Sequence, residues 1–156
     1  MAERHITVQR RMAVPVDSVW AVLADFPNLA DHWRGLKETR KIGEQARGLG
    51  ARRLVRLKPM GSMQETVINW EDGRTIATKN VPSASVPFSQ AEATLHIEPD
   101  GDGTVARFEY RYLPRGGLLG RVTGPLIDRM LTAQFTSMLS AVEKAARNAG
   151  ERATVE

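Results

Sequence analysis

The sequence contains no cysteine, which excludes disulfide bonds, thiolate metal sites and cysteine nucleophiles. Aromatic residues make up only 6% of the chain. No apolar run approaches the roughly 20 residues that a membrane-spanning helix requires. The first residues, MAERHITVQRR, are charged and alternating, unlike a signal peptide. Together these absences predict a cytoplasmic protein with no membrane insertion.

The composition is that of a single globular domain. The chain has 156 residues, of which 42% are hydrophobic and 26% charged, and this length supports one well-buried core more readily than two. We expect the domain to span residues 1–148, followed by a frayed tail over residues 149–156, where no periodic pattern continues. The histidines at 5, 32 and 96 lie apart in the sequence, and no phosphate-binding loop introduces a helix. The sequence therefore predicts neither a metal site nor a cofactor.

The order of periodic segments predicts an α+β fold. A strand over residues 4–13 leads into an amphipathic helix that Phe26 and Pro27 interrupt, and a second short helical segment follows. About six strands come next, up to residue 114, with turns at Asp72-Gly73 and at residues 101–103. A long helix occupies about residues 117–147. This order favours a curved antiparallel sheet of about seven strands wrapped around that helix, with either large side chains or a cavity between them.

The long helix carries apolar residues in two phases, which together form a wide stripe for packing against the sheet. Pro125 lies inside this pattern, so we expect a kink or turn there, with the regular helix starting beside it. The two series are Val122, Leu126 and Met130, and Ile127, Leu131, Phe135, Met138 and Val142.

Several segments, in order and at matching spacing, resemble the START-like polyketide cyclase/dehydrase and lipid-transport superfamily. They are VPVDSVWAVLADFPNLADHW, GLGARRLV, MQETVINWED, ATLHIEPDGDGTVARFEYRY and the C-terminal helix, so the resemblance covers nearly the whole chain. It implies the helix-grip fold of the major birch pollen allergen, in which two short helices form a V under one end of the long helix. It also implies a cavity beneath that helix, with Trp33 near its mouth.

Strand alternation places two charged residues on predicted inner faces. If these faces pair, Arg53 and Glu65 meet across a hairpin, and both match positions at which the family often has Arg and Glu. A buried charge is costly without a partner. Two readings stay open: an ion pair that organises the sheet, or a polar anchor for a ligand carbonyl, hydroxyl or carboxylate. The two faces comprise Ala51, Arg53, Val55 and Leu57, and Met63, Glu65, Val67 and Asn69.

The last two strands add small and aromatic residues to the inner face. Small residues such as Ala93 opposite aromatic ones leave room under the helix. A tyrosine there, Tyr110 or Tyr112, either offers its hydroxyl to a ligand or is a core residue with its hydroxyl at the rim. The predicted ligand-binding residues are Trp33, Arg53, Glu65, Phe88, Phe108, Tyr110 and Met130, and no catalytic residue is assigned.

Basic residues gather in one stretch, with nine Lys/Arg and two Asp/Glu between Arg34 and Lys58, in a chain of net charge +4. The segment between Trp33 and Lys58 has no aromatic residue for base stacking. A solvated face is therefore favoured, and no specific nucleic-acid partner is predicted.

Three functions follow from these observations. The leading hypothesis is binding of a small hydrophobic or amphipathic molecule of lipid, polyketide or quinone type in an internal cavity, by a monomer or homodimer. The first alternative is an aromatase/cyclase-like enzyme acting on a poly-β-ketone, in which Arg53 polarises a carbonyl and a tyrosine or Glu65 moves protons. The second is a protein-interaction module that uses the basic stretch.

Overall fold

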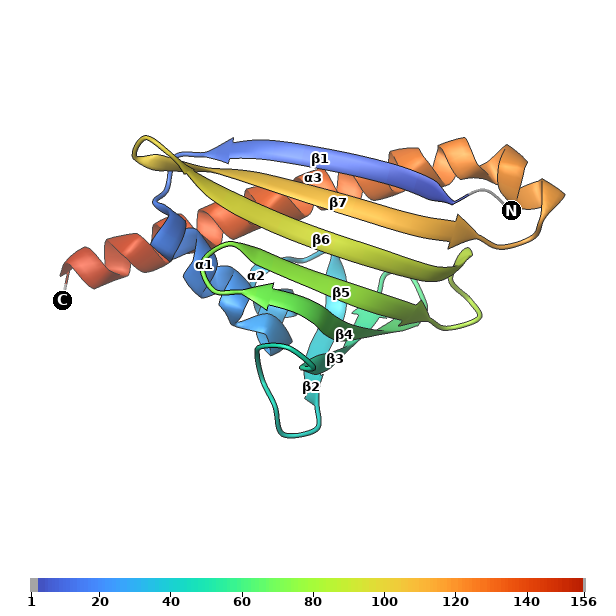
Figure 1. Ribbon diagram of the computed structural model, residues 1–156, viewed down its shortest axis with the longest axis horizontal. Coiled ribbons are helices and arrows are strands. Elements are labelled where there is room, and N and C mark those ends of the chain that lie inside the picture. The colour runs from blue at the N-terminus through green and yellow to red at the C-terminus, as the bar shows by residue number, and fades with distance from the viewer. Residues whose placement is uncertain (1–2, 156) are drawn as a thin grey trace.

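A computed structural model describes the backbone of residues 3–155 and the side chains of residues 3–152. It has the predicted α+β helix-grip architecture (Figure 1). Within the described residues, no helix combines the length and apolarity needed to cross a membrane. In chain order the elements are β1 (Arg4–Met12), α1 (Val16–Ala24), the 3-10 turn η1 (Phe26–Asn28), α2 (Leu29–His32), β2 (Leu36–Ile42), β3 (Arg52–Leu57), β4 (Ser62–Glu71), β5 (Thr75–Pro82), β6 (Phe88–Asp100), β7 (Gly103–Pro114) and α3 (Leu118–Val155).

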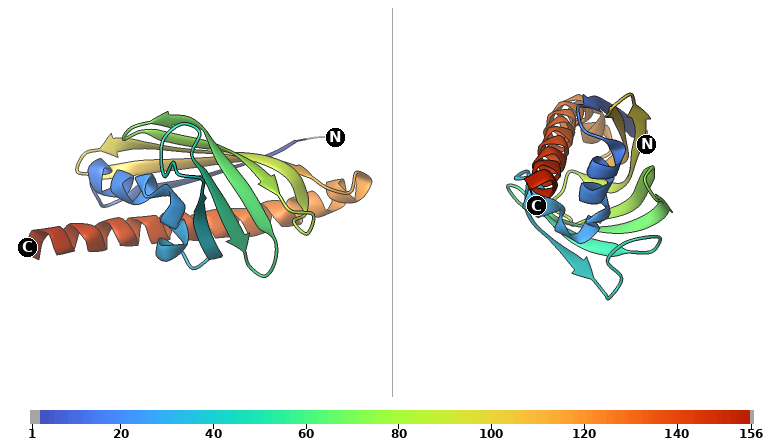
Figure 2. Two further views of the ribbon diagram at one scale, coloured as in Figure 1. Left: turned by 90° about the horizontal axis from the view of Figure 1, so that it is seen from below. Right: turned by 90° about the vertical axis from the view of Figure 1, so that its left-hand side faces the viewer.

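The strands form one seven-stranded antiparallel sheet in the order β1-β7-β6-β5-β4-β3-β2. Strands β2 to β7 follow one another as hairpins, and β1 pairs with the last strand. In the end-on view of Figure 2 the sheet curls around one side of the molecule, and α3 runs along the other. The short helices α1 and α2 lie at one end, between the sheet and α3. The sheet and α3 thus enclose a space between them.

The interrupted helix at the start of the chain supports α3. Helix α1 ends at Ala24, and Pro27 lies in η1, where its missing N–H is tolerated. Val19 and Val22 of α1 are buried in the main core, and α1 packs directly against α3. Phe26 is also buried, with 3% of its surface exposed. The break therefore turns the chain under α3 and places an aromatic side chain in the interior.

Only one of the two apolar series on α3 is buried. Ile127, Leu131 and Met138 face the core, whereas Val122 and Leu126 are 79% and 70% exposed and Met130 is 45% exposed. The sequence-based prediction of one wide core-facing stripe is therefore wrong for the first series. The physical reason is that a straight helix presents only about a third of its circumference to one sheet, so residues such as Leu126 turn away from it.

Helix α3 starts where the sequence predicted but is longer at its C-terminal end. It begins at Leu118 and continues as helix through Pro125, where we expected a kink or turn. At the other end it continues to Val155, whereas the sequence predicted a frayed tail over residues 149–156. The closing residues include Ala, Arg and Glu, which favour helix by local propensity without any packing pattern. The periodicity of buried residues therefore marked where the helix packs, not where it ends.

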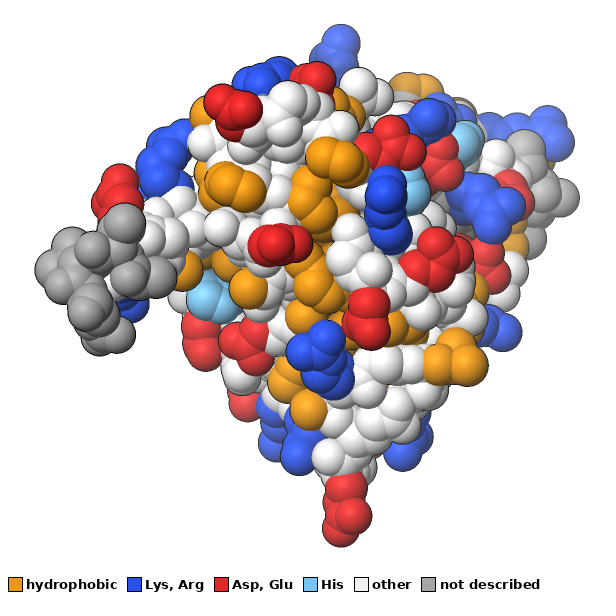
Figure 3. Space-filling model, turned by 60° about the vertical axis from the view of Figure 1, so that its left-hand side comes forward, with side chains coloured by type: hydrophobic (Ala, Val, Ile, Leu, Met, Phe, Trp, Pro, Cys, Tyr) orange, Lys and Arg blue, Asp and Glu red, His pale blue; other side chains and the backbone are white. Residues whose placement is uncertain are grey.

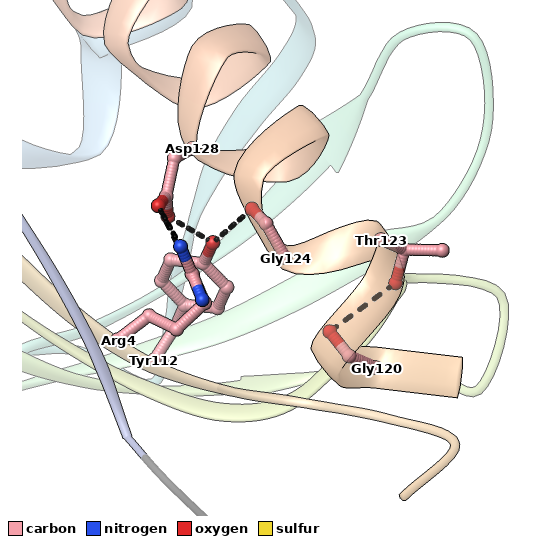
Figure 4. Close-up of polar contacts among 6 residues, drawn as sticks. All are labelled: Arg4, Tyr112, Gly120, Thr123, Gly124 and Asp128. Atoms are coloured by element: carbon pink, nitrogen blue, oxygen red, sulfur yellow. Dashed lines mark hydrogen bonds and ion pairs between the residues drawn. The ribbon is translucent and has the colours of Figure 1, made fainter. Parts of the chain in front are cut away.

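One polar cluster fastens the first part of α3 to the sheet (Figure 4). Arg4 on β1 donates from Nε and Nη2 to Asp128 Oδ2, at 3.0 and 2.5 Å. The Tyr112 hydroxyl donates to the other carboxylate oxygen of Asp128 and lies 3.4 Å from the carbonyl oxygen of Gly124. A Cβ at Gly124 would lie 2.8 Å from Arg4 Nη1, so any side chain at this position would displace the end of Arg4. The hydrogen bonds from Arg4 lower the pKa of Asp128, with a smaller contribution from Tyr112.

A second cluster fastens the later part of α3 to the other end of β1. The Glu143 carboxylate accepts hydrogen bonds from Arg10 Nε at 2.8 Å, the Ala13 backbone N–H at 2.9 Å and Arg147 Nη2 at 3.0 Å. Only 8% of the Glu143 side chain is exposed. Burial raises the pKa of Glu143, but the Ala13 N–H and the Arg10 guanidinium together outweigh it and leave the pKa below its ordinary value. The ends of β1 thus hold α3 at two points.

Candidate ligand-binding cavity

The space between α3 and the sheet contains a cavity of about 400 Å³. This volume lies in the range of small-molecule binding sites, roughly 300–1,000 Å³. The wall includes residues from α1, η1, strands β3 to β7 and α3. All seven predicted ligand-binding residues line it, namely Trp33, Arg53, Glu65, Phe88, Phe108, Tyr110 and Met130. The structure therefore brings these residues together, and their role in binding stays a prediction.

One wall of the cavity is aromatic. Phe88 on β6, Phe108 and Tyr110 on β7 and Phe135 on α3 form a connected group of rings. The centroid distances are 4.5 Å between Phe108 and Phe135 and 4.8 Å between Tyr110 and Phe135. Ala93 lies opposite Tyr110 in the β6–β7 register and also lines the cavity. As the sequence predicted, a small residue beside large rings leaves space under the helix.

The opposite wall is polar and comes from β3, β4 and β5. Arg53 is paired with Glu65, and Glu65 with Asn80, in the strand register. Arg53 Nε donates to Glu65 Oε2 at 2.7 Å, and Arg53 Nη2 lies 2.6 Å from the same oxygen. Each side chain is 12% exposed. The predicted meeting of these two residues across the hairpin is confirmed.

The surroundings of Arg53 bear on its two possible roles. Its Nη1 donates to the Phe26 carbonyl oxygen at 2.7 Å, and its guanidinium carbon lies 3.9 Å from the centroid of the Phe26 ring. Every nitrogen of the guanidinium therefore has a protein partner, and the pair joins β3, β4 and η1. An organising role is thus built into the structure, while an additional contact to a ligand stays a prediction.

Asn80 is the residue of this wall that sequence reasoning missed. Its side chain is 2% exposed and lines the cavity, and its Oδ1 atom has no hydrogen-bond partner among the described residues. A signal was present, because Ile76, Thr78 and Asn80 alternate on one face of β5. Two polar residues at inward positions of β5 indicate a lined cavity better than a packed core.

Tyr110 joins the aromatic wall to the polar wall. Its hydroxyl is 3.8 Å from Met63 Sδ and lies in a buried position. Burial raises the pKa of Tyr110, against an opposing hydrogen bond from the Asn80 side chain. The hydroxyl therefore stays protonated at neutral pH, where it can donate a hydrogen bond and is a poor base.

The mouth of the cavity lies between α3 and the β3–β4 turn, where Met130 and Met60 are 45% and 64% exposed. Trp33 is only 6% exposed and forms part of the wall, with its indole N–H 3.4 Å from Ser137 Oγ. A Cβ at Gly35 would lie 2.2 Å from the Trp33 ring. The ring thus lies directly over Gly35, which explains why that position has no side chain.

The basic stretch does not form one uniform surface. Arg53 points into the interior, and several of the remaining cations bind carbonyl oxygens or carboxylates of the same chain. In Figure 3 the Lys and Arg side chains in the lower part of the view have Asp and Glu side chains among them. Use of this stretch as a partner surface stays a prediction. The local contacts join Lys37 to the Pro59 carbonyl (2.9 Å), Lys58 to the Arg34 carbonyl (2.5 Å), Lys41 to the Glu44 carbonyl (3.2 Å) and Arg56 to Glu38 (3.7 Å).

Metal ligands are not clustered in the part of the chain that the structure describes. There, no three His, Asp or Glu side chains come close enough together to hold a metal ion. His96 is instead engaged on the outer face of β6, with Nδ1 2.8 Å from Thr75 Oγ1 and Nε2 3.0 Å from Glu98 Oε1.

A curved sheet that holds a long helix over an internal cavity defines the class of helix-grip proteins. The sequence profile of the family "Polyketide cyclase / dehydrase and lipid transport" matches residues 3–147, and the chain belongs to this family. A search of curated protein sequences found no match.

Solved structures of similar fold have low sequence identity. The protein TTHA0849 from Thermus thermophilus superposes with a TM-score of 0.76 at 16% identity, over 94% of this chain and 99% of that one. A norcoclaurine synthase point mutant from Thalictrum flavum, in complex with a transition-state analogue, gives 0.74 at 19% identity, over 96% and 97% of the two chains. Ara h 8.0201 gives 0.69 at 8% identity, over 94% and 99%. At these identities the similarity establishes the shared fold.

Proposed function

We propose that this protein binds a small hydrophobic or amphipathic molecule, of lipid, polyketide or quinone type, in the cavity beneath α3. The observation that carries the proposal is the cavity of about 400 Å³ with one aromatic and one polar wall. Apolar contact supplies affinity, at about 25 cal/mol per Å² of apolar surface removed from water. The polar wall then fixes which end of the molecule enters first.

The arrangement of charges favours binding over catalysis. Glu65 and Arg53 neutralise each other at 2.6 Å, and burial keeps the Tyr110 hydroxyl protonated. An acid–base catalyst needs a group whose pKa lies near the working pH. The norcoclaurine synthase of similar fold has been crystallised with dopamine and hydroxybenzaldehyde, so the helix-grip fold itself accommodates catalysis. In this chain, however, the two charged groups of the polar wall, Arg53 and Glu65, are paired with each other.

Two measurements test the proposal. The first is the native mass of freshly purified protein compared with its denatured mass, where a bound molecule adds a few hundred daltons that denaturation removes. The second is equilibrium dialysis against 2-methoxynaphthalene, a neutral two-ring probe. We expect saturable binding that falls at least about tenfold in Ala93→Trp, because the new ring occupies the cavity opposite Tyr110.

Ala21→Trp is the matched control, since Ala21 lies on the exposed face of α1. This variant must bind the probe as the wild type does, and urea denaturation checks that both variants fold. A protein that carries no extra mass and takes up no probe contradicts the proposal. If Ala93→Trp binds the probe as tightly as the wild type does, the probe does not bind in the cavity beneath α3.

A further inference from the structure

The polar wall contains one buried atom that the protein leaves without a partner. Asn80 is 2% exposed, and nothing among the described residues bonds to its Oδ1 atom. A buried acceptor with no donor is costly in the empty protein, and such groups are rare. Asn80 lines the cavity, and the terminal torsion of an asparagine side chain is soft. The carboxamide can therefore turn its oxygen toward a molecule in the cavity at little cost.

The neighbours of Asn80 do not supply the missing donor. Arg53 directs its nitrogens at Glu65 and at the Phe26 carbonyl. The Tyr110 hydroxyl donates to Met63 Sδ at 3.8 Å, and, against the larger effect of burial, the nearby Asn80 amide acts on that hydroxyl by lowering its pKa. Glu65, the register partner of Asn80, contributes only acceptor atoms, so none of these neighbours donates to Asn80 Oδ1.

We propose that Asn80 Oδ1 accepts a hydrogen bond from a hydroxyl group on the bound molecule. This inference rests on the proposed function and narrows its ligand class. A phenol, hydroquinone or alcohol supplies the required O–H, whereas a quinone, ketone or ether presents only acceptors. A carboxylate is disfavoured for the same reason, and because it would face Glu65. The ring system of such a ligand packs on Phe88, Phe108 and Phe135, and its hydroxyl points to β5.

The protein should discriminate strongly between ligands with and without a hydroxyl group, because the difference depends on the unsatisfied Asn80 Oδ1 atom. A ligand that fills the cavity without a donor leaves Asn80 Oδ1 buried and unpaired, while a matching hydroxyl relieves that cost. We expect 2-naphthol to bind about tenfold more tightly than its methyl ether, 2-methoxynaphthalene, which has the same rings and no O–H.

The experiment is equilibrium dialysis of the full chain against both probes, in the wild type and in Asn80→Leu. Leucine has nearly the shape of asparagine and no polar atoms. We expect the preference for 2-naphthol to disappear in Asn80→Leu while the affinity for the ether is kept or increased. The thermal midpoint of each variant without ligand checks that it folds.

Asn69→Leu is the matched control, because it makes the same change at an exposed position of β4 outside the cavity, and it should keep the preference for 2-naphthol. Equal binding of both probes by the wild type overturns the inference and leaves the proposed function intact. Tighter binding of the ether also overturns it. If neither probe binds, the proposed function fails and the inference fails with it.

Discussion

The two halves of α3 differ in how firmly they are held. In the C-terminal half, Leu139 and Val142 are each 1% exposed, and Glu143 accepts three hydrogen bonds from Arg10, Ala13 and Arg147. In the N-terminal half, Leu126 is 70% exposed, and Met130 stands at the cavity mouth. The C-terminal half of α3 thus anchors the helix, and the N-terminal half forms a partly exposed wall of the cavity.

Because of this difference, the residues that stabilise the attachment of α3 are not the residues at the mouth of the cavity. The anchor lies where α3 packs on α1 and on the far end of β1, away from the residues that form the mouth. The N-terminal half packs on the core through Ile127 and Leu131. It is also joined to the sheet by the Arg4–Asp128 ion pair, in which Asp128 is 28% exposed. Substitutions in the two halves should therefore have unequal effects, and three measurements examine this comparison.

The largest difference is expected between two leucine-to-alanine variants. Leu139→Ala removes a fully buried side chain and should lower the free energy of unfolding by about 3 kcal/mol. Leu126→Ala, in the exposed series, should change it by less than about 0.5 kcal/mol. Urea denaturation monitored by circular dichroism measures both. Similar losses in the two variants would mean that the exposed series is covered in solution.

A smaller loss is expected when the anchoring carboxylate is neutralised. Glu143→Gln keeps the shape of the side chain but weakens its bonds to Arg10, Arg147 and the Ala13 N–H, which should cost about 2 kcal/mol. Lys144→Gln removes a charge from the next, exposed position and serves as the control. The same denaturation experiment applies, and an effect no larger than that of the control would show that Glu143 does not anchor the helix.

The smallest effect concerns Asp128 and depends on pH. The hydrogen bonds from Arg4 hold the pKa of Asp128 below its ordinary value of about 4. Its contribution to stability is thus present above that value and is lost as pH falls through the lower, folded-state pKa. Asp128→Asn should cost about 1 kcal/mol at pH 7, because the pair is partly exposed. That cost should shrink as the pH falls below about 4 and Asp128 becomes protonated, and a cost that stays constant over the whole acid range would contradict it.

The sheet could be predicted in detail because strand alternation has a fixed period of two. That period alone placed Arg53 and Glu65 on facing inner positions, and the register pairs them. It failed after Val67, where the β4–β5 register shifts between Val67 and Asn69. The sequence predicted Asn69 on the inner face, but Asn69 is exposed and Trp70 packs inward against Trp20. A single extra residue in one strand reverses the faces beyond it.

The helix and the polar wall were harder to predict for different reasons. The exposure of Leu126 depends on where the sheet lies, and no local pattern on α3 contains that information. Asn80 carried a local signal, but its meaning depends on Tyr110 and Glu65, which reach it only through the register of other strands. Whether an inward-facing polar side chain has a hydrogen-bond partner therefore depends on the pairing of strands that are distant in the sequence.

Trp33 gives the cavity an optical reporter. The chain has three tryptophans, and of these Trp33 lines the cavity, whereas Trp20 and Trp70 pack edge to face with their ring centroids 5.3 Å apart. An aromatic molecule in the cavity comes within quenching range of the Trp33 indole. With Trp20 and Trp70 replaced by phenylalanine, the remaining emission would come from a single fluorophore in the wall, so the filling and emptying of the cavity could be followed in real time without a label.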